Sequence, residues 1–302
     1  MKDTSDISPS DIKSNSLIEK FLPNSFLPYS RLGRFDRPIG IWLLLIPCLW
    51  SASFASRGFP DGTLLLLFLL GAIVMRGAGC TINDIVDRKF DQMVARTASR
   101  PIPSGLVSLR GALAFLSIQL IVGLIVLVQF DRDTILIGLL SIPLIVLYPF
   151  SKQFTDWPQL FLGLVFNWGV LLGWSAVRQE ISWAAILLYC GAVFWTLGYD
   201  TIYGHQDRND DKLIGLRSLA LKFEAKTKPW LCLFFLVATL FFAMAGWLVD
   251  CGWPFYASLL VGGAHFFWQV KTLDINDPAN CLQRFKSNRD YGVIIFFGIN
   301  LG

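Results

Sequence analysis

Long apolar runs repeat along most of this chain, and they limit the possible folds more than any other feature of the sequence. Nine runs of about membrane-spanning length can be marked. They are Ile39–Phe54, Thr63–Cys80, Ala112–Val128, Thr134–Phe150, Leu160–Val177, Trp183–Leu197, Trp230–Val249, Pro254–Val270 and a last run from about Tyr291 to the chain end. A bilayer offers no water to backbone polar groups, so such runs predict transmembrane helices. We expect an all-α, polytopic membrane protein with nine transmembrane helices.

The last run is too short to cross a membrane by itself. From Tyr291 to the end, a helix would rise about 18 Å, whereas the hydrocarbon core is about 30 Å thick. This helix must therefore begin earlier, near Cys281–Arg289, or dip partway into the membrane, or be completed by packing.

Residues 1–30 differ from the rest because they are polar, rich in Ser and of mixed charge. A signal peptide needs an apolar core after a basic start, and a mitochondrial presequence should be rich in Arg and poor in acids. Neither description fits. We expect a disordered cytoplasmic tail over 1–30 and a single integral-membrane domain over 31–302.

Lys and Arg are unevenly divided between the two sides of the predicted membrane. The tail and the loops after the second, fourth, sixth and eighth runs hold 22 of these 26 residues. The opposite loops hold Arg57, Arg132 and Arg178, and Arg76 lies inside the second run. Because basic loops stay inside, the N-terminus and the basic loops are expected on the cytoplasmic side. We expect a multi-pass protein of a bacterial inner membrane.

An acidic stretch follows the second apolar run, within GAGCTINDIVDRKFDQMVARTASRPIPSG. In a helix, the spacing of Asn83, Asp84, Asp87 and Asp91 places them on one face. Carboxylates stacked in this way repel each other, and beside apolar segments they need a cation to neutralise them. Mg²⁺ binds through one or two carboxylates together with substrate phosphates. The stretch therefore predicts a site for Mg²⁺ and a diphosphate.

A second acidic stretch, DTIYGHQDRNDDKLIGLRS, follows the sixth run on the same predicted side. Asp200, Tyr203, Asp207 and Asp211 again step along one helical face. Two facing clusters could bracket a diphosphate with two metal ions. The alternative for either stretch alone is a solvated acidic loop at a helix end. The two acidic stretches follow apolar runs that are four runs apart, which also suggests a duplicated four-helix unit.

Basic residues alternate with these acids. They are Arg88, Lys89, Arg96, Arg100, Arg208, Lys212 and Arg217. Membrane topology explains some of them, but diphosphate oxygens also need hydrogen-bond donors. We expect Arg96 and Arg217 to bind the diphosphate, with further substrate contacts from Arg88 and Lys212. Lys89 and Arg100 fit either role.

Other polar residues have two interpretations each. Lys152 is an interfacial anchor or a ligand of a phosphate or carboxylate, and the same choice applies to Arg31, Arg34 and Arg37 before the first run. Arg76 needs a partner or a wet cavity inside the membrane. Asn167 either bridges helices or touches substrate.

Longer motifs around these residues resemble a known family. NDIVDRKFD with RTASRPIPSG, and YDTIYGHQDRNDDKLIGLRSLAL, resemble the two aspartate-rich motifs of UbiA-type intramembrane aromatic prenyltransferases. RPIGIWLLLIPCLWS and WPQLFLGLVFNWGVLLGW resemble the branch of that family that acts on 4-hydroxybenzoate. The match runs over nearly the whole chain from Arg34, and motifs of this length are specific.

The resemblance implies transmembrane helices around a central cavity capped by two cytoplasmic loops. It also implies Mg²⁺-dependent transfer of a polyprenyl group from polyprenyl diphosphate to carbon 3 of 4-hydroxybenzoate, a step of ubiquinone biosynthesis in the bilayer. The residues carried over are Asn83, Asp84, Asp87 and Asp91 as the first metal–diphosphate cluster and Asp207 and Asp211 as the second. Asp200 would orient or deprotonate the phenol, with Tyr203 beside the substrate.

Two positions depart from the family pattern. Gly204 stands where Ala is usual, and Gln153 follows Lys152 where some members have a second basic residue. Recognition of the acceptor carboxylate would therefore depend on Lys152 or on an N-terminal arginine such as Arg37.

Two alternatives compete with this function. One is a related prenyltransferase with another aromatic acceptor. The other is a membrane transporter, but transporters place charges near mid-membrane on broken helices, whereas these acids lie at one face among Arg and Lys. We expect no nucleic-acid partner.

Overall fold

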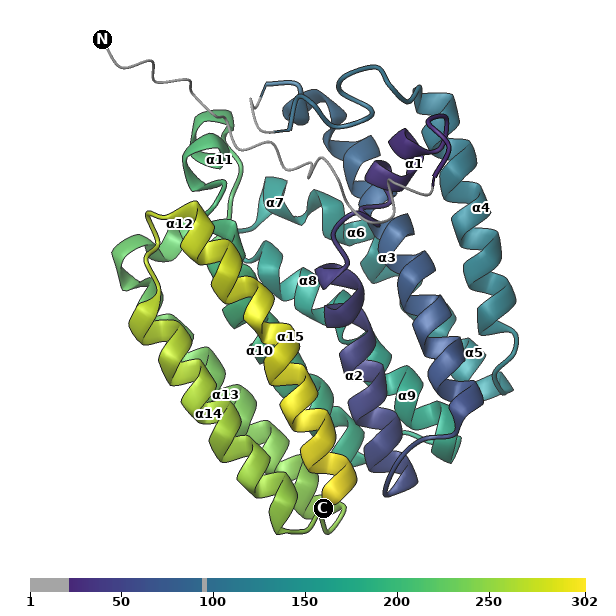
Figure 1. Cartoon of the computed structure of the whole chain (residues 1–302), viewed down its shortest axis with the longest axis vertical. Coiled ribbons are helices and arrows are strands. Elements are labelled where there is room, and N and C mark those ends of the chain that lie inside the picture. The colour runs from purple at the N-terminus through teal and green to yellow at the C-terminus, as the bar shows by residue number, and fades with distance from the viewer. Residues whose placement is uncertain (1–21, 94–96) are drawn as a thin grey trace. The chain divides into compact units, whose positions relative to one another are not determined.

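The computed structural model describes residues 22–93 and 97–302, and its regular structure in that part is entirely helical (Figure 1), which confirms the predicted all-α class. The α-helices are α1 (Leu27–Leu32), α2 (Ile39–Ser56), α3 (Gly62–Asp91), α4 (Leu109–Leu127), α5 (Arg132–Leu140), α6 (Ile142–Leu147), α7 (Ser151–Phe154), α8 (Pro158–Phe166), α9 (Trp168–Arg178), α10 (Trp183–Gly204), α11 (Arg208–Ile214), α12 (Leu219–Phe223), α13 (Thr227–Leu248), α14 (Trp253–Thr272) and α15 (Pro278–Leu301). Two 3₁₀ turns, η2 (Tyr148–Phe150) and η3 (Glu224–Lys226), join some of them.

Within the described residues, seven stretches are long and apolar enough to cross a membrane. They are Ile39–Ser56, Gly62–Asp91, Leu109–Leu127, Arg132–Phe154, Pro158–Arg178, Trp183–Gly204 and Leu219–Leu248. Helices α14 and α15 fall outside this set, so the count of nine stays a prediction. Helix α15 begins at Pro278, well before Tyr291, and its 24 residues rise about 36 Å. Of the three possibilities for the last helix, the structure therefore shows the first, a helix that begins before Tyr291.

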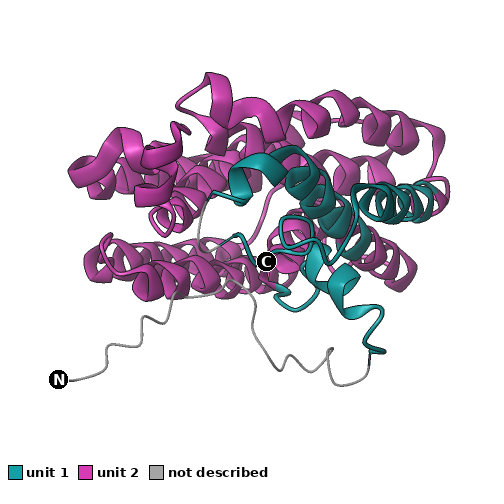
Figure 2. Cartoon of the chain, turned by 90° about the horizontal axis from the view of Figure 1, so that it is seen from above, with its two compact units in different colours: residues 1–38, 73–124 teal, residues 39–72, 125–302 magenta. Residues whose placement is uncertain are grey.

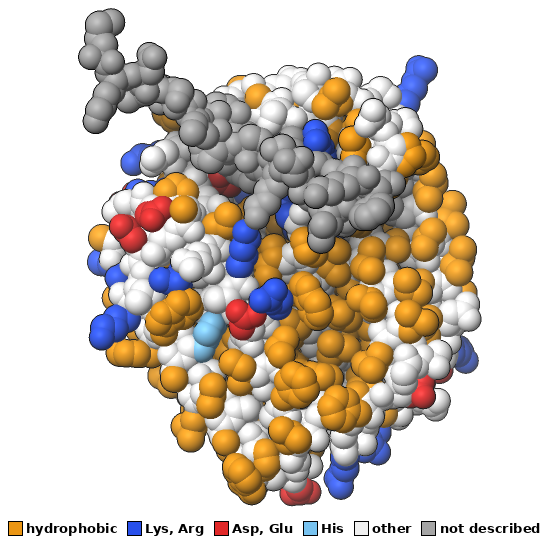
Figure 3. All heavy atoms as spheres, in the orientation of Figure 1, with side chains coloured by type: hydrophobic (Ala, Val, Ile, Leu, Met, Phe, Trp, Pro, Cys, Tyr) orange, Lys and Arg blue, Asp and Glu red, His pale blue; other side chains and the backbone are white. Residues whose placement is uncertain are grey.

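Hydrophobic side chains cover much of the surface shown in Figure 3. Trp183 and Trp247 are 74% and 72% exposed, and many leucines of the outer helices are also exposed. A soluble protein rarely exposes apolar area on this scale. Lipid is therefore the natural surrounding of these helices.

The helices group into two compact units, coloured separately in Figure 2. The first unit comprises residues 1–38 and 73–124, and the second comprises 39–72 and 125–302. In the first unit, Leu32 of α1 packs with Val107 and Ala112. Because the chain is helical from Leu27, the predicted disordered tail over 1–30 is too long at its C-terminal end. Residues 1–21 lie outside the described part, so the rest of that prediction is untested.

The second unit is built around a cluster of buried aromatic rings. The indole of Trp50 lies 5.0 Å from that of Trp195, and its Nε1–H donates to the Gly292 carbonyl at 2.8 Å. Elsewhere in this unit, Gly173 of α9 lies so close to α2 that a Cβ there would be 2.6 Å from the Cys48 carbonyl oxygen. Gly169 and Gly173 thus form a small-residue contact that lets two apolar helices approach closely.

Asn167, for which the sequence left two roles open, bridges helices of the second unit. It lies between α8 and α9, and its Nδ2 donates to the Gly163 carbonyl at 2.8 Å and to Thr196 Oγ1 of α10 at 2.7 Å. Asn167 is fully buried, so these bonds satisfy its amide nitrogen, which lipid could not.

Candidate active site

Helix α3 carries the first acidic stretch at its C-terminal end. The helix continues through Asp91, so Asn83, Asp84, Asp87 and Asp91 share the predicted face. Asn83 Nδ2 donates to Asp87 Oδ2 at 2.8 Å, one helical turn away. Asp84, Asp87 and Asp91 are only 1%, 2% and 7% exposed. Three carboxylates are thus buried close together on one helix, where charge must be compensated.

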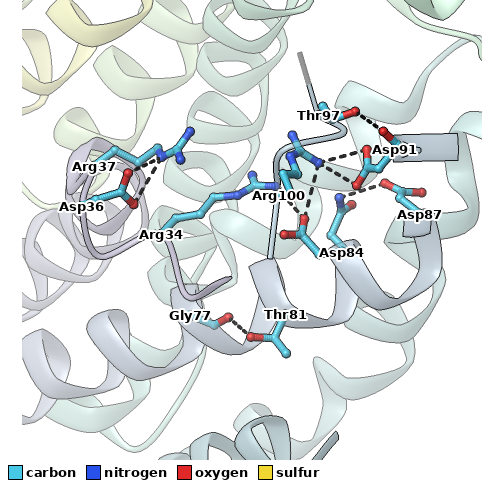
Figure 4. Close-up of polar contacts among 11 residues, drawn as sticks. Arg34, Asp36, Arg37, Gly77, Thr81, Asp84, Asp87, Asp91, Thr97 and Arg100 are labelled. Atoms are coloured by element: carbon cyan, nitrogen blue, oxygen red, sulfur yellow. Dashed lines mark hydrogen bonds and ion pairs between the residues drawn. The ribbon is translucent and has the colours of Figure 1, made fainter. Parts of the chain in front are cut away.

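Two arginines supply that compensation (Figure 4). Arg34 Nη2 lies 2.8 Å from Asp84 Oδ1, and Arg100 Nη1 lies 3.4 Å from the same oxygen. Arg100 Nη1 also lies 2.9 Å from Asp91 Oδ2. Both guanidinium groups are mostly buried, which strengthens these charge-assisted bonds. The cluster is therefore a mixed set of carboxylates and arginines within the first unit.

The backbone of Arg34 has an unusual conformation. Its φ is +55°, in the left-handed region, which costs a residue other than Gly on the order of 1 kcal/mol. The amide of the next residue, Phe35, donates to the Ser30 carbonyl at 3.0 Å and helps to hold this turn. The strained turn carries the side chain that reaches Asp84. The sequence did not distinguish Arg34 from Arg31 and Arg37, since a left-handed residue leaves no pattern.

The other basic residues predicted near the first cluster are placed differently. Arg37 Nε lies 3.1 Å from Asp36 Oδ2. Arg88 Nη1 donates to the Ile85 carbonyl of its own helix at 2.8 Å. Lys89 is exposed. Arg96 lies outside the described residues, so its predicted contact with the diphosphate is untested.

The second acidic stretch is not one continuous helix, so the single face predicted for it is wrong. Asp200 and Tyr203 belong to α10, which ends at Gly204, whereas Asp211 belongs to α11 and Asp207 precedes it. The amides of His205, Gln206 and Asp207 each donate three residues back, to Ile202, Tyr203 and Gly204. Such tight bonds end an α-helix, and Gly204 is a weak helix former.

The substrate-binding residues predicted in the second acidic stretch have surroundings that differ from one residue to the next. The Tyr203 ring lies 4.6 Å from that of Phe285. Arg217 is half-exposed, with Nη1 3.3 Å from the Phe154 carbonyl, and Lys212 is exposed. The Arg217 amide donates to the Lys152 carbonyl at 3.0 Å. The chain segments of Lys152 and Arg217 thus meet, within the second unit.

His205, in the turn after α10, is buried and neutral. Its Nε2 lies 3.0 Å from Thr227 Oγ1. Burial, helped by the charge of Arg208, lowers the pKa of His205 from the ordinary 6.5 to about 4. The folded protein therefore carries this imidazole uncharged at neutral pH.

We expect the thermal stability to fall as the pH drops below 6.5. There the unfolded chain takes up a proton that folded His205 does not, so stability is complete above pH 6.5 and is lost towards pH 4. The loss should be at most about 1.4 kcal/mol per pH unit. Melting curves of wild type and His205→Gln in detergent, recorded from about pH 7 down to about pH 5 so that they pass through the ordinary histidine pKa, measure it. Equal pH dependence in both proteins would contradict this assignment.

The donor atoms of the first cluster are of the kind that a hard divalent cation binds. In the described part of the chain, no three Asp, Glu, His or Cys side chains converge as a ready-made metal site. Mg²⁺ does not require such a cage, because one or two carboxylates and the substrate phosphates suffice. Asp84 and Asp87 offer carboxylate oxygens, and Asn83 an amide oxygen. The nearby arginines could also bind phosphate oxygens.

Comparison with known proteins agrees with this chemistry. The model of the UbiA prenyltransferase family matches residues 44–298. The mitochondrial 4-hydroxybenzoate polyprenyltransferase of Homo sapiens is 48% identical over 285 residues, which cover 93% of this chain and 76% of the relative. The protein of that name from Arabidopsis thaliana is 45% identical over 294 residues, covering 96% and 72%.

Solved structures share the fold. A UbiA homolog from Aeropyrum pernix K1 superposes with a TM-score of 0.73 at 23% identity, covering 86% of this chain and 97% of that one. A UbiA homolog from Archaeoglobus fulgidus, bound to GPP and Mg²⁺, gives a TM-score of 0.68 at 19% identity, covering 91% and 100%.

The predicted location in a bacterial inner membrane is wrong. The relatives of Homo sapiens, Arabidopsis thaliana and Drosophila melanogaster are all named as mitochondrial. The distribution of Lys and Arg indicates which side of a membrane a loop occupies, but it does not identify the membrane.

Proposed function

The chain belongs to the UbiA prenyltransferase family, and on this basis we propose that it transfers a polyprenyl group from polyprenyl diphosphate to carbon 3 of 4-hydroxybenzoate. This is a step of ubiquinone biosynthesis, in a mitochondrial membrane. Family membership also decides against the transporter alternative. The observation that carries the proposal is the buried cluster of Asp84, Asp87 and Asp91 with Arg34 and Arg100.

This cluster binds the diphosphate end of the prenyl donor. Asn83, Asp84, Asp87 and Asp91 would hold Mg²⁺, which would neutralise the negative charge that develops on the departing diphosphate. Arg34 and Arg100 donate hydrogen bonds to phosphate oxygens, since both are within reach of the same carboxylate. Asp207 and Asp211 of the second acidic stretch form the second metal–diphosphate cluster of this proposal. The proposed substrate contacts come from Arg88, Arg96, Lys212 and Arg217.

The reaction breaks the bond between the allylic carbon and the diphosphate oxygen, and the electron pair leaves with the diphosphate. Carbon 3 of the aromatic ring then attacks the allylic cation, and the proton on that carbon is lost. Asp200 orients or deprotonates the phenol, which makes the ring more electron-rich, and Tyr203 lies beside the substrate. Lys152 or Arg37 binds the acceptor carboxylate. The apolar surroundings protect the cation from water.

We expect the purified protein to convert 4-hydroxybenzoate in the presence of Mg²⁺ and a polyprenyl diphosphate. Rates with equal concentrations of a naphthoate and homogentisate should be at least about tenfold lower, because these molecules place their carboxylate differently relative to the attacking carbon, and a site that fixes the carboxylate and phenol of 4-hydroxybenzoate would misplace that carbon. Chromatography of the prenylated products in detergent measures this. Faster product formation with another acceptor would keep the reaction class and replace the proposed substrate.

A further inference from the structure

Arg284, near the start of α15, is a buried cation with no role in the proposed reaction. It is 8% exposed, and its guanidinium lies over the ring of Trp268 of α14, with Cζ 4.1 Å from the ring centroid. Among the described residues it forms no ion pair, and its Nε has no hydrogen-bond acceptor. A cation–π contact offsets part of the cost of burying the charge, but the Nε–H donor remains unsatisfied.

A second donor without an acceptor lies beside the same ring. The imidazole of His265 is 5.5 Å from the ring of Trp268, and its buried Nε2 has no partner in the described chain. Whether this nitrogen carries the imidazole proton follows from a buried chain of hydrogen bonds. The indole of Trp195 can only donate, so the atom of Asn288 that it contacts at 2.9 Å is the amide oxygen.

That assignment fixes the remaining groups. The Nδ2 of Asn288 donates to Gln269 Oε1 at 3.1 Å, so the other end of the Gln269 amide is its nitrogen. Gln269 Nε2 lies 3.0 Å from His265 Nδ1 and donates to it. Nδ1 is therefore an acceptor, and the imidazole proton is on Nε2. His265 and Arg284 thus present two donors beside Trp268, and the missing group is an acceptor.

The surroundings of these donors indicate a lipid. On α14, Leu260, Val261 and Phe267 are 79%, 55% and 68% exposed, which makes this helix face lipid-facing. His265 lies seven residues before the end of α14 and Arg284 six residues after the start of α15, so each is about 10 Å from the loop between them. Both donors therefore lie within about two turns of the ends of their helices, nearer to the interfacial region than to the middle of the bilayer. Lys271 near the end of α14 adds positive charge on the side that is rich in Lys and Arg.

We propose that Arg284, His265 and Trp268 form a binding site for the phosphate group of an anionic phospholipid. The phosphate accepts from Arg284, with His265 as the neighbouring donor, and the acyl chains lie along the exposed apolar face of α14. Basic sites between helices on this side of a membrane bind such headgroups. The site shares no residue with the acidic clusters, so lipid binding can be measured without turnover.

The test compares lipid binding by wild type, Arg284→Gln and Arg289→Gln in detergent. Arg289 is a matched control because it belongs to the same helix but is half-exposed and paired with Asp290 at 2.7 Å. Cardiolipin, phosphatidylcholine and inorganic phosphate are titrated, and the rise in melting temperature and the bound lipid seen by native mass spectrometry are recorded. We expect cardiolipin to stabilise wild type and Arg289→Gln equally, and to bind Arg284→Gln about tenfold more weakly.

Two outcomes would overturn the proposal. One is equal cardiolipin binding by wild type and Arg284→Gln. The other is equal stabilisation by inorganic phosphate and cardiolipin, which would assign the site to a free anion. If Arg284→Gln does not fold, Arg284→Lys replaces it. Lysine keeps the charge but not the planar stacking on Trp268, so weaker binding is again expected, and unchanged binding would contradict the role of Arg284.

Discussion

Replacing Asp84 by Asn is expected to lower the rate of prenyl transfer by about two to three orders of magnitude. Asp84 Oδ1 accepts from both Arg34 and Arg100, and the side chain is almost completely buried. An uncharged amide of the same size removes the negative charge that the proposed metal site needs and leaves two arginines without their shared carboxylate. Initial rates in membranes, normalised to inserted protein, measure the effect.

A matched control separates this loss from a general effect of removing a carboxylate. Asp133, an exposed residue in the first turn of α5, is replaced by Asn in the same way, and it should keep full activity. Melting temperature and membrane insertion are recorded for both variants. Full turnover by a folded Asp84→Asn protein would show that the first cluster does not carry the reaction.

Removal of divalent cations is expected to lower turnover by more than about a thousandfold, because a metal ion contributes several kcal/mol to stabilising charge on a leaving phosphate. The protein is treated with EDTA, and product is then measured before and after addition of Mg²⁺. Binding of a non-reactive diphosphate analogue is measured in parallel, which gives a readout independent of chemistry.

The EDTA-treated protein must also melt at an unchanged temperature before Mg²⁺ is added, so that the loss is not unfolding. Addition of Na⁺ at equal ionic strength is the control for screening. We expect Mg²⁺ to restore both analogue binding and turnover. Turnover that persists in EDTA would require the arginines alone to compensate the diphosphate charge.

The parts of the structure that could be predicted are those with a short repeat in the sequence. The apolar runs predict helices, and a spacing of three and four residues places Asn83, Asp84, Asp87 and Asp91 on one face of α3. The same reasoning failed from Asp200 to Asp211. There the polar residues keep a helical spacing, but the backbone tightens at His205 and starts a new helix at Arg208.

The partners of the acids were harder to predict. Arg34 lies fifty residues before Asp84 in the chain, and no spacing rule connects them. Arg100 is closer, but the loop that brings it to Asp84 and Asp91 has no helical period. Of the two arginines expected to bind the diphosphate, Arg217 lies against Phe154 and Asp156, whereas Arg96 is outside the described residues and its predicted contact stays a prediction. Tertiary contacts of this kind can be predicted only when the fold itself is known.

The left-handed turn at Arg34 has a consequence for protein engineering. A common way to stabilise a protein is to replace left-handed residues by Gly, and five positions qualify here: Arg34, Arg57, Gln179, Glu224 and Asp250. At Arg34 the gain in backbone energy would remove the side chain that pairs with Asp84. Because a buried carboxylate that loses its partner costs about 3–5 kcal/mol, more than the backbone gain, Gly at position 34 would lower stability as well as activity. Selection for stability should leave residue 34 unchanged and use the other four turns.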